Sequence, residues 1–235
     1  EHLIEPRNRL LRMILAVLLV FIPLYAFANE LYTLLSEPLR AALPEGATMI
    51  ATQVASPFLA PFKLTLVLAV FVAIPYILYQ VWSFIAPALY RNEKRLAIPL
   101  LISSIGLFYL GVVFAYFVVF PLAFGFFASA SPDGVAMMTD INSYLDFVLK
   151  LFFAFGVAFE IPIATLLMVK TGMTTVANLK QKRPFVVVGC FVIGMLLTPP
   201  DVVSQTLLAL PMWVLYETGI FCCRWLNLGE SQQRN

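Results

Sequence analysis

The chain alternates between long apolar stretches and short polar ones. Six stretches carry few or no charged residues, at roughly 10–28, 64–86, 96–120, 147–169, 185–198 and 202–221. A helix needs about 20 residues to cross the hydrocarbon core of a bilayer, and most of these stretches reach that length. Because lipid offers the backbone no hydrogen-bond partners, spanning segments form helices or closed barrels, and these lengths favour helices. The pattern predicts an all-α integral membrane protein with six transmembrane helices, the last two of them short.

Composition agrees with this fold class and indicates no second domain. Of 235 residues, 61% are hydrophobic and only 12% are charged. A soluble domain could not cover so much apolar surface with polar residues. No internal repeat, low-complexity tract or separate soluble segment interrupts the pattern, so we expect one transmembrane domain over residues 1–235.

Two longer connections separate the apolar stretches, at about 29–63 and 121–146. The first contains Leu31–Leu43, whose apolar residues recur at helical spacing and predict a helix along the membrane surface. The second contains a Ser-Pro-Asp-Gly sequence at 131–134, which is typical of a turn. We expect both connections on the outer side of the membrane, because the remaining ones are shorter and basic.

Lysine and arginine residues are distributed unevenly between the two sides. Three fall on the side of the longer connections, namely Arg40, Lys63 and Lys150. The others fall on the opposite side, and they are Arg7, Arg9, Arg12, Arg91, Lys94, Arg95, Lys170, Lys180, Lys182, Arg183, Arg224 and Arg234. Because positive charges collect in cytoplasmic loops, this asymmetry predicts that both termini are cytoplasmic. Membrane topology explains the basic residues, so we expect no binding to nucleic acid.

The fifth apolar stretch is short for a membrane span. Residues 185–198 as a helix would cover about 21 Å, against a hydrocarbon core of about 30 Å. The stretch ends in a tight turn at Thr198-Pro199-Pro200-Asp201. We expect this hairpin to thin the bilayer locally or to be sheltered by a partner helix.

Polar residues interrupt the later apolar stretches. Glu160 lies near the centre of the fourth one, where a charged carboxylate costs at least about 2.5 kcal/mol. It is either a polar recognition point beside a water-lined hollow or a protonated group bonded within the bundle, and Pro162 beside it predicts a kink. Gln205 lies near the outer end of the sixth stretch and can bond across helices. Glu217, near the inner end, is expected to reach towards Arg224.

Two glutamates stand among basic residues at predicted cytoplasmic edges. The aromatic-rich segment Tyr79–Arg95 contains Glu93, and Glu5 precedes Arg9 by four residues. In one interpretation each carboxylate forms an exposed ion pair with its neighbours, worth about 0–1 kcal/mol. In the other, each accepts a guanidinium from a ligand, a directional contact that prefers arginine to lysine. Two such carboxylates would suit a peptide with adjacent arginines; the residues alone favour the ion pairs slightly and leave both interpretations open.

Residues that enzymes commonly use are missing or badly placed. The only histidine is His2, outside the apolar stretches, which excludes an HExxH zinc site and an intramembrane Ser–His pair. No G-x-x-x-x-G-K sequence is present to hold a nucleotide. Cys190, Cys222 and Cys223 are not spaced as a zinc site and are expected to be free thiols. We predict a protein with no catalytic residue, metal or cofactor.

Several motifs together resemble the TatC family, whose members are the multispanning core subunits of the twin-arginine protein translocase. The resemblance covers essentially the whole chain and is strongest to proteobacterial members. The motifs are His2-Leu3-Ile4-Glu5 with Arg7 and Arg9, Met49–Thr52 with Ala55–Phe58, Tyr79–Tyr90 with Glu93, Phe114–Phe126, and Leu197–Asp201 followed by Ser204-Gln205-Thr206.

This resemblance implies a fold and a function. TatC-like proteins have six helices in a concave, cupped-hand arrangement, with both termini cytoplasmic, in the bacterial cytoplasmic (inner) membrane. They bind the Arg-Arg motif of signal peptides and export folded proteins by using the proton motive force. Glu5 and Glu93 occupy the positions of the family's recognition carboxylates, and Arg7 and Phe84 belong to the same signal-peptide-binding surface.

Further positions take their expected roles from the same resemblance. The family's proline in the first outer loop corresponds to Pro38, its intramembrane acid to Glu160, and its polar residues near the last hairpin to Asp201 and Gln205. The family's partner subunits, TatB and TatA, dock along the last two helices near Met195, Leu196 and Thr198. The resemblance also implies contact with membrane lipids and self-association in a receptor complex.

One position departs from the family pattern. Pro6 stands where family members usually have leucine. Proline disfavours helical backbone in the residue before it, so we expect the first helix to begin at or near Pro6, with Glu5 re-aimed in the cap region. We also expect twin-arginine peptides to bind more weakly than they would to the Pro6→Leu variant.

An alternative function is a proton-coupled small-solute secondary transporter with Glu160 as its coupling acid. Such transporters usually contain paired repeats and helices broken at mid-membrane. The sequence has no visible repeat, which favours the translocase.

Overall fold

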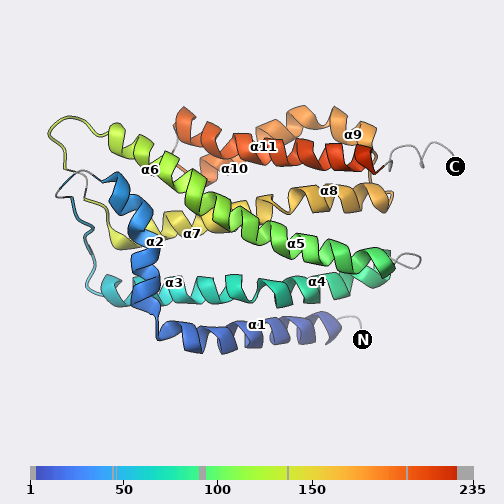
Figure 1. Ribbon diagram of the computed structural model, residues 1–235, viewed down its shortest axis with the longest axis horizontal. Helices are drawn as coiled ribbons and strands as arrows, with labels where there is room; N and C mark the ends of the chain where they lie inside the picture. Colours follow the sequence, from blue (N-terminus) through green and yellow to red (C-terminus); the bar gives the residue numbers. More distant parts are fainter. Residues whose placement is uncertain are drawn as a thin grey trace. The chain divides into compact units, whose positions relative to one another are not determined.

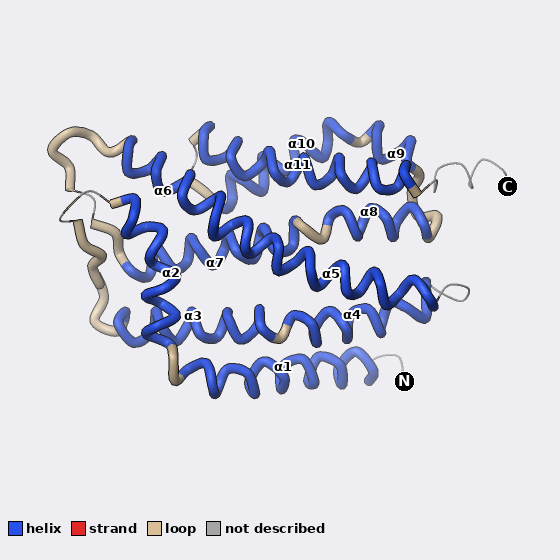
Figure 2. Tube along the Cα trace, in the orientation of Figure 1, coloured by secondary structure: helices blue, strands red, loops and turns tan. Residues whose placement is uncertain are grey.

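The computed structural model describes residues 4–43, 45, 47–89, 94–136, 138–199 and 201–226, and most of them are helical (Figures 1 and 2). The described part of the chain has no strand beyond one isolated β-bridge between Ile50 and Asp140. The elements in chain order are α1 (Ile4–Tyr25), α2 (Ala28–Ala42), α3 (Ser56–Val72), α4 (Ile74–Leu89), α5 (Lys94–Phe114), the π-helical turn η1 (Ala115–Val119), α6 (Phe120–Ser129), α7 (Ile141–Ala158), α8 (Ile161–Lys170), α9 (Val176–Gln181), α10 (Arg183–Leu197) and α11 (Val202–Trp225).

Within the part of the chain that the structure describes, six apolar helical stretches account for the predicted membrane class. Four are long enough to cross a bilayer, at Ile4–Tyr25, Ala97–Ser129, Ile141–Lys170 and Val202–Trp225. A fifth consists of α3 and the start of α4, which are bent by 50° relative to each other, and α10 is a shorter apolar helix. The prediction of an all-α integral membrane protein is confirmed. The number of crossings and the side on which each terminus lies stay predictions.

The predicted start of the first helix is wrong. α1 begins no later than Ile4, so Glu5 has helical backbone and is not in a cap. Pro6 then lies in the first turn, where backbone N–H groups have no intrahelical acceptor, so its missing N–H removes no helix bond. The helical spacing noted in Leu31–Leu43 is borne out by α2, which spans Ala28–Ala42.

The chain forms two compact units. The first consists of Glu1–Ile105 and Phe120–Leu149, and the second of Gly106–Val119 and Lys150–Asn235. In the first unit α1 packs along α3 and α4, while α2 contacts α3 and α6 and runs across them (Figure 1). Leu39 of α2 and Leu64 of α3 are among its fully buried side chains.

One end of the first unit is fastened by polar contacts between distant segments. The amide of Ile50 donates to the carbonyl of Thr139 at 3.0 Å, and the amide of Ile141 donates to the carbonyl of Ile50 at 2.9 Å. Asp140 accepts from the amide and the hydroxyl of Thr52 at 3.1 and 2.9 Å. Residues 50–52 are thereby held against the start of α7.

In the second unit α11 packs between α8 and α10, with α9 beside its later part (Figure 1). The approach of α11 to α8 requires a glycine, because a Cβ at Gly219 would overlap the hydroxyl of Thr165 and lie 3.1 Å from the Cα of Pro162. Next to α10, Ala209 and Met212 pack on Cys190 in a small apolar cluster.

The helix predicted to kink at Pro162 is interrupted there. α7 ends at Ala158 and α8 begins at Ile161, with Phe159 and Glu160 in a turn between them. The amide of Glu160 donates to the carbonyl of Val157, three residues back, at 3.0 Å. Because proline has no N–H, it cannot continue the bonding pattern of the preceding helix.

Candidate functional site

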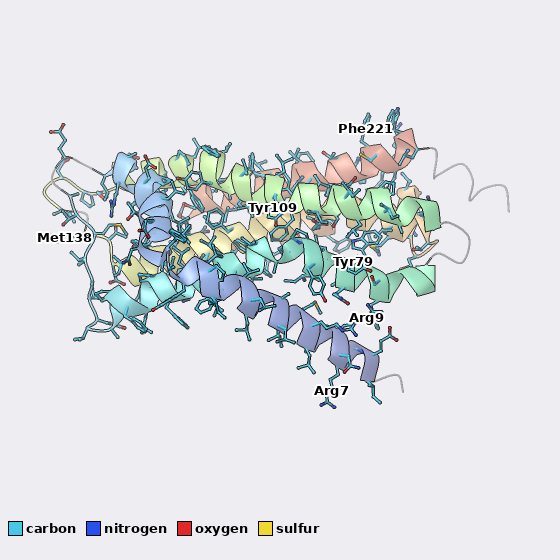
Figure 3. The ribbon with its side chains drawn as sticks, turned by 60° about the horizontal axis from the view of Figure 1, so that its bottom comes forward. Arg7, Arg9, Tyr79, Tyr109, Met138 and Phe221 are labelled. Carbon is cyan, nitrogen blue, oxygen red and sulfur yellow. The ribbon has the colours of Figure 1, made fainter. Side chains whose placement is uncertain are left out.

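In the first unit, α1 and α4 each carry a set of side chains spaced four residues apart. α4 has Tyr76, Gln80 and Phe84 at intervals of four residues, and this interval places side chains on one face of a helix. α1 has Glu5 and Arg9 at the same interval. α1 packs beside α4, and its Arg9 points towards α4 (Figure 3).

Arg9 connects the two sets of side chains by hydrogen bonds. Its Nη2 donates to Oε1 of Glu5 at 2.8 Å, and its Nε donates to the same oxygen at 3.3 Å. Its Nη1 donates to Oε1 of Gln80 at 3.1 Å. Gln80 in turn donates from Nε2 to the hydroxyl of Tyr76 at 2.9 Å. One guanidinium therefore links a carboxylate on α1 to an amide and a phenol on α4.

This network runs from Gln80, which is buried, to its exposed end at Glu5, while Tyr76 on the other side of Gln80 is 37% exposed. Gln80 is 5% exposed, whereas the side chains of Arg9 and Glu5 are 22% and 64% exposed. A shallow hollow of about 330 Å³ adjoins the exposed end, and the residues that line it are Ile4, Glu5, Asn8, Arg9 and Arg12. Glu5 thus presents much of its carboxylate outward while Arg9 holds one of its oxygens.

The exposed carboxylate of Glu5 can bind a cation at this site. An ionised carboxylate accepts hydrogen bonds at both oxygens and prefers the forked donors of a guanidinium. Among the residues that the structure describes, no group of three or more His, Cys, Asp or Glu side chains is placed to hold a metal ion.

The predicted signal-peptide-binding residues are brought together only in part. Phe84 is 53% exposed, on the same face of α4 as Gln80. Arg7 is exposed and points away from α4, unlike Arg9 (Figure 3). Glu93 lies outside the described residues. Of the two interpretations of Glu5, the ion pair with Arg9 is present.

The sequence analysis singled out neither Gln80 nor Tyr76, the two members of the network on α4. Gln80 is the only amide side chain in the apolar stretch 64–86. A polar side chain within a membrane helix needs a hydrogen-bond partner, which it normally finds on a neighbouring helix. This is the signal that identifies Gln80, although spacing alone does not say that its partner is Arg9.

The prediction that Glu217 reaches towards Arg224 is wrong. Oε2 of Glu217 accepts from Nη2 of Arg183 at 2.6 Å, and not from Arg224. Arg183 is the first residue of α10, which packs along α11 and brings the guanidinium beside Glu217. On the adjacent position of α11, the hydroxyl of Tyr216 donates to the carbonyl of Leu179 in α9 at 2.7 Å.

Residues at the hairpin between α10 and α11 mainly shape the turn. The carboxylate of Asp201 caps α11 by accepting from the amide of Ser204 at 2.7 Å. The hydroxyl of Thr198 donates to the carbonyl of Gly194 at 2.7 Å. A Cβ at Gly194 would lie 3.3 Å from the backbone of Gln205, so the two helices approach closely here.

The remaining predicted residues lie on helices or directly beside one. Pro38 is inside α2, and Glu160 is the residue before α8. Met195 and Leu196, near the end of α10, are 51% and 73% exposed. These two apolar side chains are therefore free to contact lipid or another helix.

Asp140 lies outside the membrane-spanning segments, and the pKa of its carboxyl is lowered. Hydrogen bonds from the backbone amides of Thr52 and Ser143, followed by those from their hydroxyls, hold the pKa of the Asp140 carboxyl below its ordinary 3.8. Such bonds favour the charged form because a carboxylate is the better acceptor. The charged carboxylate of Asp140 therefore strengthens the hydrogen bonds that hold residues 50–52 against the start of α7.

Comparison with known proteins gives consistent matches. The family model described as "Sec-independent protein translocase protein (TatC)" matches residues 1–211. The Sec-independent protein translocase protein TatC of Azotobacter chroococcum is 67% identical over 220 residues, which cover 94% of this chain and 86% of the relative. The protein of the same name from Escherichia coli strain K12 is 58% identical over 233 residues, covering 99% of this chain and 90% of the relative.

Two solved structures match the fold over nearly its full length. One is described as the crystal structure of the twin-arginine translocase receptor TatC, with a TM-score of 0.84, 40% identity and 98% of both chains covered. The other is described as the same receptor in DDM, with a TM-score of 0.86, 41% identity, and 94% of this chain and 99% of that chain covered.

Proposed function

Because the chain belongs to the TatC family of Sec-independent protein translocase proteins, we propose that its surface around Glu5 receives the Arg-Arg motif of signal peptides. The chain is a multi-pass membrane component of the translocase. The proposed site is the exposed end of the network between α1 and α4.

The observation that carries this proposal is the contact between Glu5 and a guanidinium. Arg9 donates to Oε1 of Glu5 from both Nη2 and Nε, so the carboxylate is oriented for the forked donors of arginine. The Glu5 side chain is 64% exposed, which leaves room for a second cation to approach. Charge-assisted bonds of this kind are directional and favour arginine over lysine.

We further propose that Glu93 receives the second arginine of the motif. This assignment rests on the family resemblance, since Glu93 is outside the described residues. Phe84 would contact an apolar part of the peptide, in keeping with its 53% exposure. Arg7 points away from α4, so we assign it to the anionic headgroups or a more distant part of the same surface (Figure 3).

The setting of this function is also proposed from the family. We place the protein in the bacterial cytoplasmic (inner) membrane with both termini in the cytoplasm, where the binding surface would meet newly made cargo. Export of folded proteins would be driven by the proton motive force. The basic residues near the proposed cytoplasmic ends support this orientation.

TatB and TatA are the proposed partners of α10 and α11. α10 has 15 residues and covers about 22 Å, less than the membrane core, and it exposes Met195 and Leu196. An apolar hollow of about 190 Å³ lies between α10 and α11, lined by Val187, Cys190, Phe191, Ala209, Leu210 and Trp213. A partner helix along this surface would shelter the short hairpin ending at Thr198.

Photocrosslinking of a twin-arginine signal peptide and of its twin-lysine version tests the receptor function. We expect the wild-type protein to crosslink the arginine peptide preferentially, and Glu5→Gln and Glu93→Gln each to reduce this crosslinking by about two- to fivefold, the range given by exposed ion pairs.

Glu37→Gln is a matched control for the photocrosslinking, since it removes an exposed glutamate from α2, outside the proposed site. It should leave crosslinking unchanged. Arginine-selective crosslinks that persist in both the Glu5 and the Glu93 variants would exclude these carboxylates as the readers of the motif.

A further inference from the structure

We propose that Arg9 occupies the Glu5 carboxylate as an internal ligand and that an incoming guanidinium has to displace Arg9. We also propose that Gln80 positions Arg9 for this role. The proposal rests on the function proposed above for Glu5 and names a residue that sets how tightly that site binds. Its basis is the geometry of four side chains on α1 and α4.

Arg9 occupies Glu5 in the manner expected of a ligand arginine. Two of its nitrogens, Nη2 and Nε, donate to Oε1 at 2.8 and 3.3 Å. A signal-peptide arginine that approaches this carboxylate therefore meets a guanidinium already bound to one of its oxygens. Full engagement of Glu5 requires these two bonds to open.

The contact between Arg9 and Glu5 is weak enough to open. The Glu5 side chain is 64% exposed, and exposed ion pairs four residues apart on a helix contribute little because water and salt screen them. The peptide arginine would replace an equivalent bond, so the site loses no hydrogen bonding in the exchange. The cost to the peptide is the separation of Arg9 from Glu5.

Gln80 holds Arg9 from the other side. Its Oε1 accepts from Nη1 of Arg9 at 3.1 Å, and its own amide is fixed by the bond to the hydroxyl of Tyr76. Gln80 is 5% exposed, so this anchor is shielded from water. By restricting the rotamers of Arg9, Gln80 keeps the guanidinium beside Glu5 and raises the fraction of time that the carboxylate is occupied.

An internal occupant lowers the affinity for every competing cation by the same factor. The apparent dissociation constant of a ligand rises in inverse proportion to the fraction of sites that are free, whichever ligand is measured. Twin-arginine and twin-lysine peptides should both bind more tightly when Arg9 is removed, and their affinity ratio should not change. An unchanged ratio therefore identifies Arg9 as an occupant of Glu5, whereas a changed ratio would identify it as a residue that contacts the peptide.

Binding of fluorescent twin-arginine and twin-lysine peptides to the full chain in lipid nanodiscs, followed by anisotropy, tests this inference. Arg9→Gln should lower both dissociation constants by about two- to fivefold, the range given by exposed ion pairs. Arg12→Gln is the matched control, because it removes the same charge from the same hollow without vacating Glu5. Its effect should be clearly smaller than that of Arg9→Gln.

Gln80→Leu tests the positioning role in a double-mutant cycle with Arg9→Gln. Alone, it should tighten peptide binding by less than Arg9→Gln does; added to Arg9→Gln, it should have no further effect. If Gln80→Leu increases the affinity only when Arg9 is present, Gln80 acts through the Arg9 guanidinium. Equal effects of Gln80→Leu in both backgrounds would overturn the positioning role.

Failure of this inference is distinguishable from failure of the proposed receptor site. If Glu5→Gln does not weaken binding of the arginine peptide, the Glu5 site itself is wrong. If Glu5→Gln weakens binding but Arg9→Gln fails to tighten it, or tightens it no more than Arg12→Gln, Arg9 is no occupant. A change in the ratio of arginine to lysine affinity would instead make Arg9 a direct contact of the peptide.

Discussion

Among single residues, Asp140 combines a local role with a long-range one. Its Oδ1 accepts from the amide and hydroxyl of Thr52, and its Oδ2 accepts from the amide and hydroxyl of Ser143 at 3.1 and 3.2 Å. The first pair of bonds fastens a distant loop, and the second pair caps the start of α7. Both pairs favour the ionised carboxylate.

The stability of the first unit should therefore depend on pH through Asp140. The pKa of this carboxyl is lowered in the folded protein, so its contribution is complete above 3.8, the ordinary pKa, and is lost as the pH falls through the lower folded value. We expect Asp140→Asn to lower the thermal unfolding midpoint at pH 7 and to flatten the acid decline below pH 3.8, measured in detergent.

Asp133→Asn provides the comparison for this variant, because Asp133 lies in the exposed turn at 131–134. It should leave both the midpoint and its acid decline as in the wild type. An Asp140→Asn protein with an unchanged acid decline would show that the Asp140 charge does not stabilise the fold.

Residue-level prediction succeeded where partners lie one helical turn apart. The spacing of Glu5 and Arg9 predicted their ion pair, because residues four apart share a helix face. Gln80 bonds Tyr76 within α4, but its second partner Arg9 and the Arg183 partner of Glu217 are on other helices, 71 and 34 residues away. Helix packing decides such pairs, and one sequence carries no signal for that packing.

Among helices and their contacts, prolines and glycines explain most departures from straight spans. Pro162 interrupts the helix between α7 and α8, as its position predicts. Pro75 has the same position at the start of α4, where the 50° bend from α3 occurs, and the same reasoning would have predicted it. The apolar pattern reveals spans because lipid demands them, whereas bends depend on single residues within an unchanged pattern.

The contact between α8 and α11 should be sensitive to one methyl group. A Cβ at Gly219 would overlap the hydroxyl of Thr165, so Gly219→Ala should destabilise the protein by about 1–3 kcal/mol, the usual cost of overpacking. Unfolding in mixed micelles, monitored by circular dichroism, measures this change.

Gly189→Ala in α10 is the matched substitution, since a Cβ there meets no atom within 4 Å. Alanine favours helix over glycine by up to about 1 kcal/mol, so this variant should be neutral or slightly more stable. Equal destabilisation by both alanines would point to a general effect of glycine replacement and not to the contact with Thr165.

For the whole molecule, the sequence predicted the class and the family more securely than the site. Six apolar stretches and their lengths led to an all-α membrane protein, and motifs spread along the chain led to TatC. The motif residues around Glu5 and Arg9 did not reveal that Gln80 shares their surroundings. Family motifs mark positions, while the hydrogen bonds at those positions depend on how the helices pack.

The family relationship predicts that this chain works with the subunits of a relative. Expressed behind a start methionine in Escherichia coli lacking its own TatC, it should restore export of a folded reporter with a twin-arginine signal, given 58% identity over 233 residues. Pro6→Leu, which restores the leucine usual in the family, should raise the export rate. Cell fractionation with the reporter measures both.

The same Escherichia coli cells without any TatC are the reference for background. Export by the wild-type chain no greater than this background would contradict the exchange of subunits. An unchanged rate in Pro6→Leu would mean that Pro6, placed in the first turn of α1, does not impair recognition.

The bond between Thr52 and Asp140 has a consequence for biosynthesis. The two residues are 88 positions apart, so at ribosomal speeds of about 5–20 residues per second Thr52 is made roughly 4–18 s before its partner. During that interval the loop at 50–52 lacks its fastening, and a nascent chain arrested before residue 140 should expose it to proteases. Completion of the first unit is therefore timed by the synthesis of α7, well after α1–α4 have been made.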